Sequence, residues 1–341
     1  MENLNRLTAS EVERLLPAYI QNKKPVLLVG APGIGKSDIV AQAAKKTGFE
    51  LKIYHPVLDD PTDYKGLPFA TSSGEANFLP FGNLLELINA EKDTIAFLDD
   101  LGQAPESVQA ALMQLLLARE INGHKISDKV TFVAATNRRK DRAGVRGILE
   151  PVKSRFNAIF ELQVEPDDWY RWALKNDMPM ELVAFLRFRP NLLMDDEITG
   201  DMQNKPSPRT WAKLGEVMEF LPEDLLINAA AGSVGDGAAT EFNAFIKTWK
   251  SMPDPDAVIA NPKKFDVPNE LSVQYALVTA MVYRTSDVTF DNIMEYLGRF
   301  TPEFLVMYIK DAISKCPEIT QLKSYIEWAC GDGGKMLGVT K

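Results

Sequence analysis

Short runs of apolar residues alternate with helical patterns through residues 1–162 of the chain. The runs at 25–30, 50–55, 94–99, 129–136 and 157–162 are rich in Val, Ile, Leu and Phe. Near-continuous apolar strands separated by helices are typical of a parallel sheet whose two faces are both covered. The pattern therefore predicts an α/β core with a five-stranded parallel sheet.

Two stretches interrupt this alternation and are predicted to be β-hairpins. Residues 65–82 (KGLPFATSSGEANFLPFG) would turn at the Ser-Gly pair 73–74. Residues 119–126 (REINGHKI) would turn at the Asn-Gly pair 122–123, which is a strong two-residue hairpin signal. Both hairpins would extend from the α/β core.

Helical patterns dominate from residue 163 onward. The stretch 252–264 (MPDPDAVIANPKK) is rich in Pro and Asp and is expected to be a linker, and the last residues (GDGGKMLGVTK) are expected to be a flexible tail. Three parts are therefore expected, namely an α/β core in 1–162, a helical region in 163–250 and a second helical region in 251–341.

The composition of the 341-residue chain excludes several classes of protein. A hydrophobic content of 45% and a formal net charge of −9 indicate a globular protein with no global attraction to nucleic acid or anionic lipid. No apolar run approaches the ~18 residues of a spanning helix, and the start MENLNRLTAS lacks a signal-peptide pattern. We expect a soluble, cytoplasmic protein with no membrane partner. Cys316 and Cys330 are expected to be reduced core residues.

The segment GAPGIGKS carries the most specific motif of the chain. It fits G-x-x-x-x-G-K-[ST] at every fixed position and lies between a predicted strand and a predicted helix. In such a phosphate-binding loop, backbone N–H groups surround a phosphate, the Lys reaches the β- and γ-phosphates, and the Ser ligates Mg²⁺. No N-K-x-D guanine motif is found, so ATP with Mg²⁺ is expected. The residues of the loop are Gly30, Ala31, Pro32, Gly33, Ile34, Gly35, Lys36 and Ser37.

Two adjacent carboxylates, Asp99 and Asp100, end the apolar run at 94–99. Because an unpaired buried carboxylate is costly, such a pair beside a phosphate-binding loop is expected to serve Mg²⁺ and water. Asp99 would hold the metal as the Walker B acid, together with Ser37, and Asp100 would orient or deprotonate the attacking water. Asp100 replaces the Glu of most such ATPases and is shorter by one methylene, which bears on the hydrolysis rate. A helix-capping role is the alternative for Asp100.

Two further polar residues are candidates for phosphate contact. Asn137 ends the apolar run at 129–136, where its amide could hydrogen-bond the γ-phosphate or its water, or could close an Asx-turn. Arg209 lies in the first turn of a predicted helix, where a cation opposes the helix dipole. A nucleotide phosphate would satisfy Arg209, and an ordinary ion pair is the alternative.

A basic run stands out in this acidic chain between residues 138 and 155. A basic patch of this kind can serve nucleic acid, the nucleotide of a neighbouring subunit, or solvation alone. Arg155 directly precedes an apolar strand, a rigid position suited to an arginine finger, and Arg142 and Arg146 are the loop alternatives. The basic residues of the run are Arg138, Arg139, Lys140, Arg142, Arg146, Lys153 and Arg155, against Asp141 and Glu150.

The aromatic and histidine residues give weaker signals. Phe69, Phe78 and Phe81 on the first hairpin could grip a substrate, although packing onto the hairpin's own core is the more ordinary expectation. His55 and His124 have no ligand-spaced companions, so neither is expected to bind a metal or act as a nucleophile.

Together these motifs resemble the MoxR-like AAA+ ATPases of the helix-2-insert group. The similarity covers GAPGIGKS, DPTDYKG, LDDLGQAPESVQAALMQLL with Walker B, REINGH as the pre-sensor-1 hairpin, AATN as sensor 1, and the tripeptides SRF and SPR. These motifs follow one another in order across residues 28–220. The chain departs from the family at Asp100 and at LGQA, where the family usually shows INRA.

The resemblance implies an αβα AAA+ core with a helix-2 insert, a helical lid carrying sensor 2 in 163–250, and a C-terminal helical region. It also implies hexameric rings that bind ATP between subunits and remodel partner proteins, often with a von Willebrand A-domain companion. By position, Asn137 corresponds to sensor 1, Arg155 to an arginine finger acting in trans, and Arg209 to sensor 2.

Three functions are compatible with these residues. The first is an ATP-hydrolysing, ring-forming chaperone of the MoxR type. The second is a nucleic-acid motor, favoured by the basic run and the helicase-like inserts but opposed by the acidic remainder and the lack of a recognisable DNA-binding module. The third is an ATP-gated binding switch with slow hydrolysis, suggested by Asp100.

Overall fold

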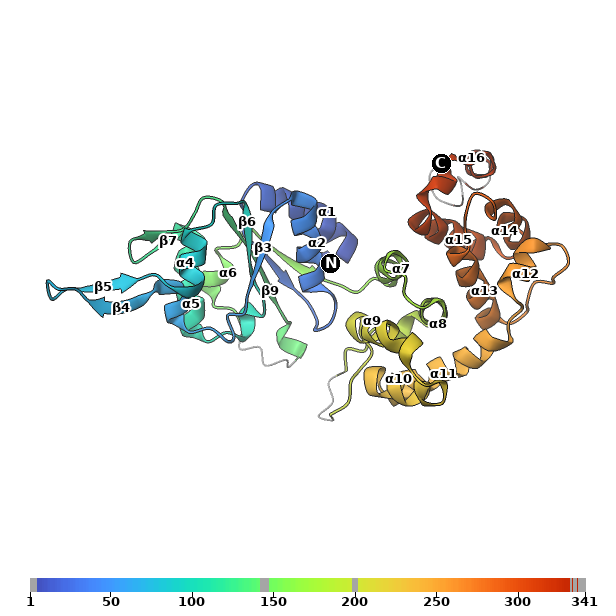
Figure 1. Ribbon diagram of the computed structural model, residues 1–341, viewed down its shortest axis with the longest axis horizontal. Helices are drawn as coiled ribbons and strands as arrows, with labels where there is room; N and C mark the ends of the chain where they lie inside the picture. Colours follow the sequence, from blue (N-terminus) through green and yellow to red (C-terminus); the bar gives the residue numbers. More distant parts are fainter. Residues whose placement is uncertain (1–4, 142–146, 198–201, 332, 334–335, 337–341) are drawn as a thin grey trace. The chain divides into compact units, whose positions relative to one another are not determined.

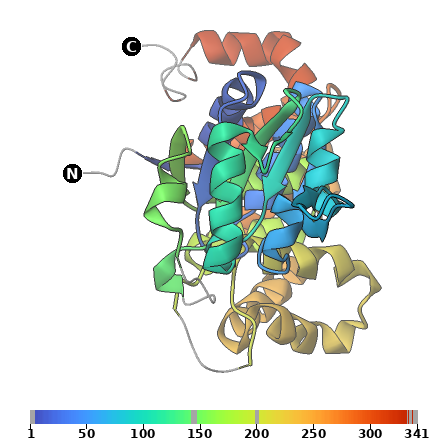
Figure 2. The ribbon, with the colours of Figure 1, turned by 90° about the vertical axis from the view of Figure 1, so that its left-hand side faces the viewer.

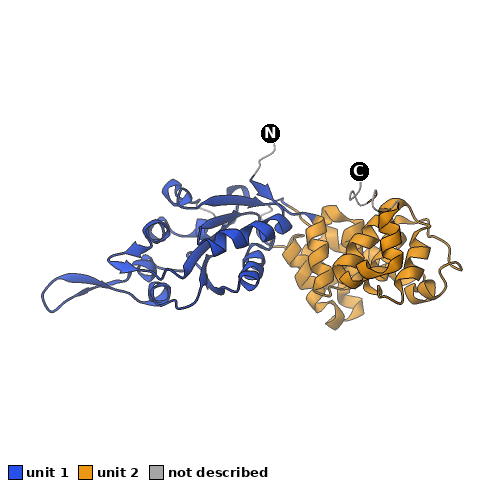
Figure 3. Ribbon diagram, turned by 90° about the horizontal axis from the view of Figure 1, so that it is seen from above, with its two compact units in different colours: residues 1–165, 196–199 blue, residues 166–195, 200–341 orange. Residues whose placement is uncertain are grey.

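The computed structural model describes residues 5–141, 147–197, 202–331, 333 and 336. The chain divides into two compact units (Figure 3), of which unit 1 comprises residues 1–165 with 196–199 and unit 2 comprises 166–195 with 200–341. Within the described residues, no helix has the length and apolar character needed to cross a membrane. The division of residues 163–341 into a lid and a C-terminal region stays a prediction.

A six-stranded parallel sheet forms the centre of unit 1 (Figure 1), with the order β1-β10-β2-β9-β6-β3. All five predicted strands are confirmed to within one residue at each end. The sixth strand, at the edge, was not predicted, because two residues are too few to form an apolar pattern. The strands are β1 (Arg6–Leu7), β2 (Val26–Val29), β3 (Glu50–Tyr54), β6 (Thr94–Leu98), β9 (Val130–Thr136) and β10 (Ala158–Leu162).

Helices cover both faces of this sheet, as the αβα prediction requires. Figures 1 and 2 show α1 and α2 on one face and α4, α5 and α6 on the other. The helices are α1 (Ala9–Gln21), α2 (Lys36–Thr47), α3 (Pro61–Lys65), α4 (Gly82–Ile88), α5 (Glu106–Ala118) and α6 (Glu150–Lys153), with 3₁₀ turns η1 (Leu101–Gln103) and η2 (Arg139–Asp141).

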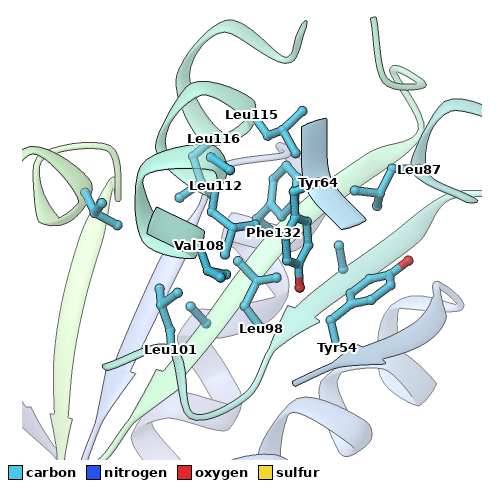
Figure 4. Packing of buried hydrophobic residues seen from close by; sticks show 14 of the residues in the cluster. Tyr54, Tyr64, Leu87, Leu98, Leu101, Val108, Leu112, Leu115, Leu116 and Phe132 are labelled. Carbon is cyan, nitrogen blue, oxygen red and sulfur yellow. The ribbon is translucent and has the colours of Figure 1, made fainter. Parts of the chain in front are cut away.

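Helix α5 is fixed to the sheet by its apolar face (Figure 4). Val108, Leu112 and Leu115, at helical spacing, are fully buried and belong to the cluster that includes Leu98 of β6 and Phe132 of β9. Each such side chain contributes about 1.5–3 kcal/mol on burial. The packing holds the turn between β6 and α5, which begins with the two acidic residues, in a defined place.

Both predicted hairpins are present in unit 1. Strands β4 (Leu67–Ala70) and β5 (Ala76–Leu79) pair antiparallel, as do β7 (Glu120–Ile121) and β8 (His124–Lys125). The turn between β7 and β8 has two positive φ angles, 51° at Asn122 and 81° at Gly123. These are the angles of the type I′ turn that the Asn-Gly pair predicts.

The two hairpins are joined by side-chain hydrogen bonds to backbone carbonyls. Nδ2 of Asn122 donates to the carbonyl of Lys65 at 2.8 Å, and Nε2 of His124 lies 2.7 Å from the carbonyl oxygen of Phe78. The expectation that Phe69 packs onto a core is wrong, since its side chain is 45% exposed. All residues of β4 are exposed, so this strand has no core of its own to cover.

Unit 2 is helical in its described residues. Phe185 lies in an aromatic core with Trp211, Phe242 and Phe245, at ring-centroid distances of 5.2–5.7 Å. The helices are α7 (Pro166–Lys175), α8 (Met180–Phe188), α9 (Pro208–Val217), α10 (Leu226–Val234), α11 (Asp236–Ser251), α12 (Pro255–Ala260), α13 (Leu271–Tyr283), α14 (Phe290–Leu297), α15 (Pro302–Lys315) and α16 (Lys323–Cys330), with 3₁₀ turns η3 (Pro190–Leu192), η4 (Met218–Phe220), η5 (Glu223–Leu225) and η6 (Pro317–Gln321).

Two sequence expectations in unit 2 are wrong. The expected linker at 252–264 contains helix α12, in which Asp254 is the N-cap and Val258 is fully buried. The same Pro and Asp residues that suggested a linker also begin helices. Cys316 is half-buried and Cys330 is exposed, so neither is a core residue. Most of the expected tail lies outside the described residues.

A buried ion pair joins two helices of unit 2. Arg187 of α8 donates to the Asp311 carboxylate of α15, and the two side chains are only 10% and 8% exposed. Arg187 also donates to Asp167 at 2.7 Å and lies 3.9 Å from the ring centroid of Tyr170. Despite Arg187, burial raises the pKa of the Asp311 carboxyl from 3.8 to about 6.

This pKa shift predicts how the stability of the protein depends on pH. Because the folded state holds the Asp311 proton to a higher pH than the unfolded state, the free energy of unfolding should fall as pH rises from about 4 to about 6. Asp311→Asn should remove this fall, which is worth roughly 2–3 kcal/mol. Denaturant unfolding of parent and variant across that range tests the prediction. If the free energy of unfolding depends on pH in the same way for the parent and the variant, the prediction is wrong.

Candidate functional site

The loop of residues 30–37 connects β2 to α2 and has the backbone that its glycines allow. Gly33 and Gly35 have φ angles of 79° and 93°, which L-residues with side chains rarely adopt. A Cβ on Gly30 would lie 2.4 Å from Cδ1 of Ile34. Helix α2 begins at Lys36, directly after the left-handed residue Gly35, so the loop leads into a helix N-terminus, where the first N–H groups have no acceptor within the helix itself.

Lys36 is buried inside this loop, with 6% of its surface exposed. Its ammonium donates to the carbonyls of Gly30 at 3.0 Å and Ala31 at 2.9 Å, and to Oδ1 of Asn137 at 2.7 Å. The charge therefore lies where the loop and the end of β9 meet. A phosphate in the loop would be a stronger acceptor for it than these neutral groups.

The two acidic residues after β6 have different partners. Oδ2 of Asp99 accepts a hydrogen bond of 3.0 Å from the Ser37 hydroxyl, so these two oxygens face each other across the site. Asp100 has a left-handed backbone with a φ of 54°. The turn this produces directs Asp100 differently from Asp99, although the two are adjacent in the chain.

Asn137 connects Lys36 to Asp100. While Oδ1 of Asn137 accepts from Lys36, its Nδ2 donates to Oδ1 of Asp100 at 3.2 Å. Asp100 also accepts from Nε2 of Gln103 at 3.4 Å, and within the described chain its side chain makes no capping hydrogen bond to η1. These contacts follow from the strand order, since β9 lies between β2 and β6.

The DPTDYKG stretch forms helix α3 and its N-terminal cap. Asp60 accepts from the backbone N–H of Thr62 at 2.9 Å, while Asp63 accepts from the N–H of Asp60 at 2.8 Å. The hydrogen bonds from Thr62 lower the pKa of Asp60. Tyr64 is buried and donates to Asp59. These contacts are those of a capping box and a buried tyrosine.

The basic run is partly neutralised by acids of the same unit. Arg138 contacts Asp141 at 2.8 Å and Asp196 at 3.1 Å, and Lys153 contacts Glu150. Arg139 and Lys140 are exposed. The alternative finger candidates, at positions 142 and 146, lie outside the described residues.

Arg155 lies between α6 and β10. Its side chain is half-buried, its Nε is buried without a hydrogen-bond partner, and one terminal nitrogen donates to the Ser154 hydroxyl at 3.2 Å. The backbone N–H of Arg155 donates to the carbonyl of Val152, which is fully buried. The residue is therefore anchored by its backbone, while its side chain stays partly exposed.

Arg209 belongs to unit 2 and is described within that unit. It is exposed in the first turn of α9, two residues after the N-cap Ser207. A capping box joins Ser207 to Thr210. The prediction that Arg209 lies in the first turn of a helix is thus confirmed. A role for Arg209 at the nucleotide stays a prediction.

The remaining candidates do not form a site. His55 is exposed, and His124 contacts the first hairpin. Among the described residues, no three His, Cys, Asp or Glu side chains form a metal cluster.

A cavity of about 320 Å³ borders Asn137 but lies on the face of the sheet that carries α5. The residues that line the cavity are Leu27, Val29, Glu106, Thr136, Asn137, Arg138, Arg139, Gly147, Ile148, Leu149, Glu150, Lys153 and Ile159.

Sequence reasoning missed Gln109 of α5, which is fully buried. Gln109 lies on the same helical face as Leu112. A polar side chain at such an apolar core position is the sequence signal that could have identified it. Gln109 contacts both the turn after β6 and residues 147–149, which are distant in sequence.

Comparison with known proteins identifies the domain. Residues 25–156 match the family model of an AAA domain of the dynein-related subfamily. Midasin from Giardia intestinalis is 26% identical over 174 residues, which make up 48% of this chain and 4% of midasin. The Holliday junction branch migration complex subunit RuvB from Acholeplasma laidlawii is 24% identical over 171 residues, 45% of this chain and 43% of RuvB. The chain thus spans less than half of either relative.

Among solved structures, the RuvB branch migration motor of Thermotoga maritima covers 85% of each chain at 17% identity, with a TM-score of 0.40. NtrX from Brucella abortus covers 96% of this chain and 67% of its own, at 12% identity and a TM-score of 0.36. At such TM-scores the structural likeness adds nothing to the family match. The matched segment holds the phosphate-binding loop, the two acidic residues, Asn137 and Arg155, so residues 25–156 constitute an AAA+ domain, the nucleotide-binding domain of the AAA+ ATPases.

Proposed function

We propose that the protein hydrolyses ATP at the site formed by the ends of β2, β9 and β6. The observation that carries this proposal is the continuous set of contacts from Lys36 through Asn137 to Asp100, beside the contact of Ser37 with Asp99. The backbone N–H of Asp100 donates to Oδ1 of Asp99 at 3.0 Å, so the proposed phosphate-binding cation, metal-binding oxygens and base lie within one hydrogen-bonded group.

The loop supplies what a triphosphate needs. The left-handed glycines 33 and 35 allow backbone N–H groups to turn toward a phosphate, and Lys36 is already desolvated. Two backbone carbonyls and an amide oxygen accept from it, and a charged phosphate oxygen would be a stronger acceptor than these neutral groups.

The oxygen pair fits Mg²⁺. The Ser37 hydroxyl and the Asp99 carboxylate lie 3.0 Å apart, and Mg²⁺ is commonly held by one or two protein oxygens with phosphate and water completing its shell. When bound, the ion would neutralise charge on the phosphates.

Asp100 and Asn137 are proposed to act on the attacking water. Asn137 donates to Asp100, so its amide orients the carboxylate that would accept the water's proton. Because Asp is shorter than Glu, the distance from Asp100 to that water would limit the rate. If this distance is too long for efficient proton transfer, the protein would bind ATP but hydrolyse it slowly, and would act as an ATP-gated binding switch.

Substitutions of Asp99 and Asp100 test whether the two carboxylates have separate roles in metal binding and hydrolysis. We expect Asp99→Ala to weaken Mg²⁺-dependent ATP binding, and Asp100→Asn to keep binding but lower hydrolysis by about 10²–10⁴-fold, the usual contribution of a general base. Asp100→Glu should preserve or raise the rate. ATP titration and phosphate release measure the two effects separately. If Asp100→Asn hydrolyses ATP like the parent, Asp100 has only a structural role.

We further propose that the protein is a ring-forming chaperone of the MoxR type that remodels or activates partner proteins.

 
This finer assignment rests on the motif order across residues 28–220, and hexameric assembly and a von Willebrand A-domain partner belong to the same proposal. In such a ring, Arg155 would reach the γ-phosphate bound by the adjacent subunit and Arg209 would contact the nucleotide from unit 2. The side chain of Arg155 is only half-buried and its hydrogen bond to Ser154 is exposed, which supports a contact outside its own subunit.

A nucleic-acid motor is the second candidate, because one relative is named a Holliday junction branch migration subunit. The ion pairs of Arg138 and Lys153 count against it, since they neutralise part of the basic run. Binding of single- and double-stranded DNA at about 50 and 200 mM salt discriminates between the two functions. We expect no tight binding, whereas an affinity that falls by about 10³-fold or more between these salt concentrations would favour the motor.

A further inference from the structure

The fully buried side chain of Gln109 connects the two parts of the AAA+ domain that the proposed function places at different nucleotides. One part is the turn after β6, which carries the acidic pair. The other is the segment that leads through α6 to Arg155. The inference rests on the proposed function, in which the acidic pair serves the subunit's own nucleotide and Arg155 serves that of its neighbour.

Three hydrogen bonds of Gln109 define this connection. Its Nε2 donates to the carbonyl of Ala104 at 3.1 Å and to the carbonyl of Gly147 at 2.9 Å. Its Oε1 accepts from the backbone N–H of Leu149 at 3.0 Å. The amide orientation follows from these partners, since carbonyls require the nitrogen and the N–H requires the oxygen.

A backbone hydrogen bond reinforces the connection. The N–H of Gly147 donates to the carbonyl of Gly102 at 3.1 Å, two residues after Asp100 in the same turn. Residues 147–149 therefore meet the turn through both Gln109 and Gly102. They belong to no helix or strand, so these contacts replace regular secondary structure in holding them.

The path continues from Leu149 to Arg155 through short, well-packed steps. The carbonyl of Leu149 accepts from the N–H groups of Val152 and Lys153 at 2.9 and 3.0 Å, which starts helix α6. Val152 is fully buried in the same core cluster as Val108 of α5. The carbonyl of Val152 then accepts from the N–H of Arg155 at 3.0 Å.

We propose that Gln109 is a positioning residue that holds the segment carrying Arg155 in register with the acidic turn of the same subunit. The acidic turn itself has other supports, since Asp100 contacts Asn137 and Gln103 and follows the fully buried strand β6. Loss of Gln109 should therefore disturb the Arg155 segment more than the turn.

Hydrogen exchange of the native protein tests the connection without reference to activity. Gln109→Leu removes all three hydrogen bonds at similar side-chain size, and Gln114→Leu, at an exposed position of the same helix, is the matched control. We expect the Leu149 amide to exchange at least about 10-fold faster in Gln109→Leu but not in the control, with the amides inside α5 unchanged. Unchanged protection of the Leu149 amide would overturn the proposal.

Mixed assemblies test the functional consequence. Asp100→Asn subunits supply only an intact Arg155, and Arg155→Ala subunits supply only an intact acidic pair. Gln109→Leu is added to one partner at a time, and hydrolysis is compared with the mixture that lacks it. We expect about a 10-fold or greater loss when the Asp100→Asn partner carries Gln109→Leu, and less than about a 2-fold loss when the Arg155→Ala partner carries it.

The outcomes separate positioning from general damage. Equal losses in both arms, or no loss in either, would overturn the positioning role. If the mixture without Gln109→Leu has no activity although mixed assemblies form, the proposal of a finger acting in trans has failed. The exchange of the Leu149 amide then decides whether Gln109 holds the segment.

Discussion

Lys36→Ala is expected to abolish ATP binding at working concentrations and, with it, any assembly that depends on nucleotide. The ammonium is buried and has three acceptors around it, so it can be desolvated in the loop and aimed at a phosphate without further rearrangement. Removing one partner of a buried charged hydrogen bond costs about 2–5 kcal/mol, which corresponds to roughly 30- to 5,000-fold in affinity.

Titration with a fluorescent ATP analogue measures this loss, and size-exclusion chromatography with and without ATP measures assembly. Lys45→Ala is the matched control, because Lys45 is exposed on the same helix, α2. The control should bind ATP like the parent. Equal affinities for the parent and Lys36→Ala would rule out the loop as the phosphate site.

Arg155→Ala is expected to lower hydrolysis by about 10³-fold or more while ATP affinity in the subunit's own loop stays within a few fold. The reason is that Arg155 would act only on the charge that develops at the neighbour's γ-phosphate. Anchoring of its backbone by Val152 allows the side chain to be removed without displacing α6.

The matched control for this variant is Arg139→Ala, an exposed arginine of the same basic run. It should retain the parent's rate in single-turnover and steady-state assays. If Arg155→Ala hydrolyses ATP at the parent's rate, the finger lies elsewhere, and positions 142 and 146 become the candidates to substitute next.

The sheet could be predicted from sequence largely because its central strands β6 and β9 are buried throughout and are therefore almost entirely apolar. The motif after β2 fixes which end of the sheet carries the site. Parallel strands bring their carboxyl ends together, so the proximity of Lys36, Asn137 and Asp100 was foreseeable. Strand β1 was not, since its two residues are defined only by pairing with Glu161 and Leu162.

Other features depend on tertiary contacts that the sequence pattern does not contain. Asp254 and Pro255 suit a linker and a helix start equally well, and only the burial of Val258 distinguishes the two. Whether Phe69 is buried depends on which elements pack against the first hairpin, and these are not encoded in the hairpin's own sequence. Gln109 bonds to a carbonyl 38 positions away in the chain, and no local signal identifies such a partner.

The central claim is that a neighbouring subunit completes the ATPase site. The most direct test is to mix the Arg155→Ala and Asp100→Asn proteins and to measure ATP hydrolysis. Each variant should bind ATP but be nearly inactive alone, because one lacks the finger and the other lacks the base. In an equal mixture, roughly a quarter of the junctions would join an intact Asp100 to an intact Arg155.

Phosphate release is therefore expected to recover to as much as roughly a quarter of the parent's rate once subunits have exchanged, with mixed assembly verified by native mass spectrometry of differently tagged chains. Dilution below the assembly concentration should remove the recovered activity. Verified mixed assemblies that remain as inactive as the separate variants would contradict a site shared between subunits.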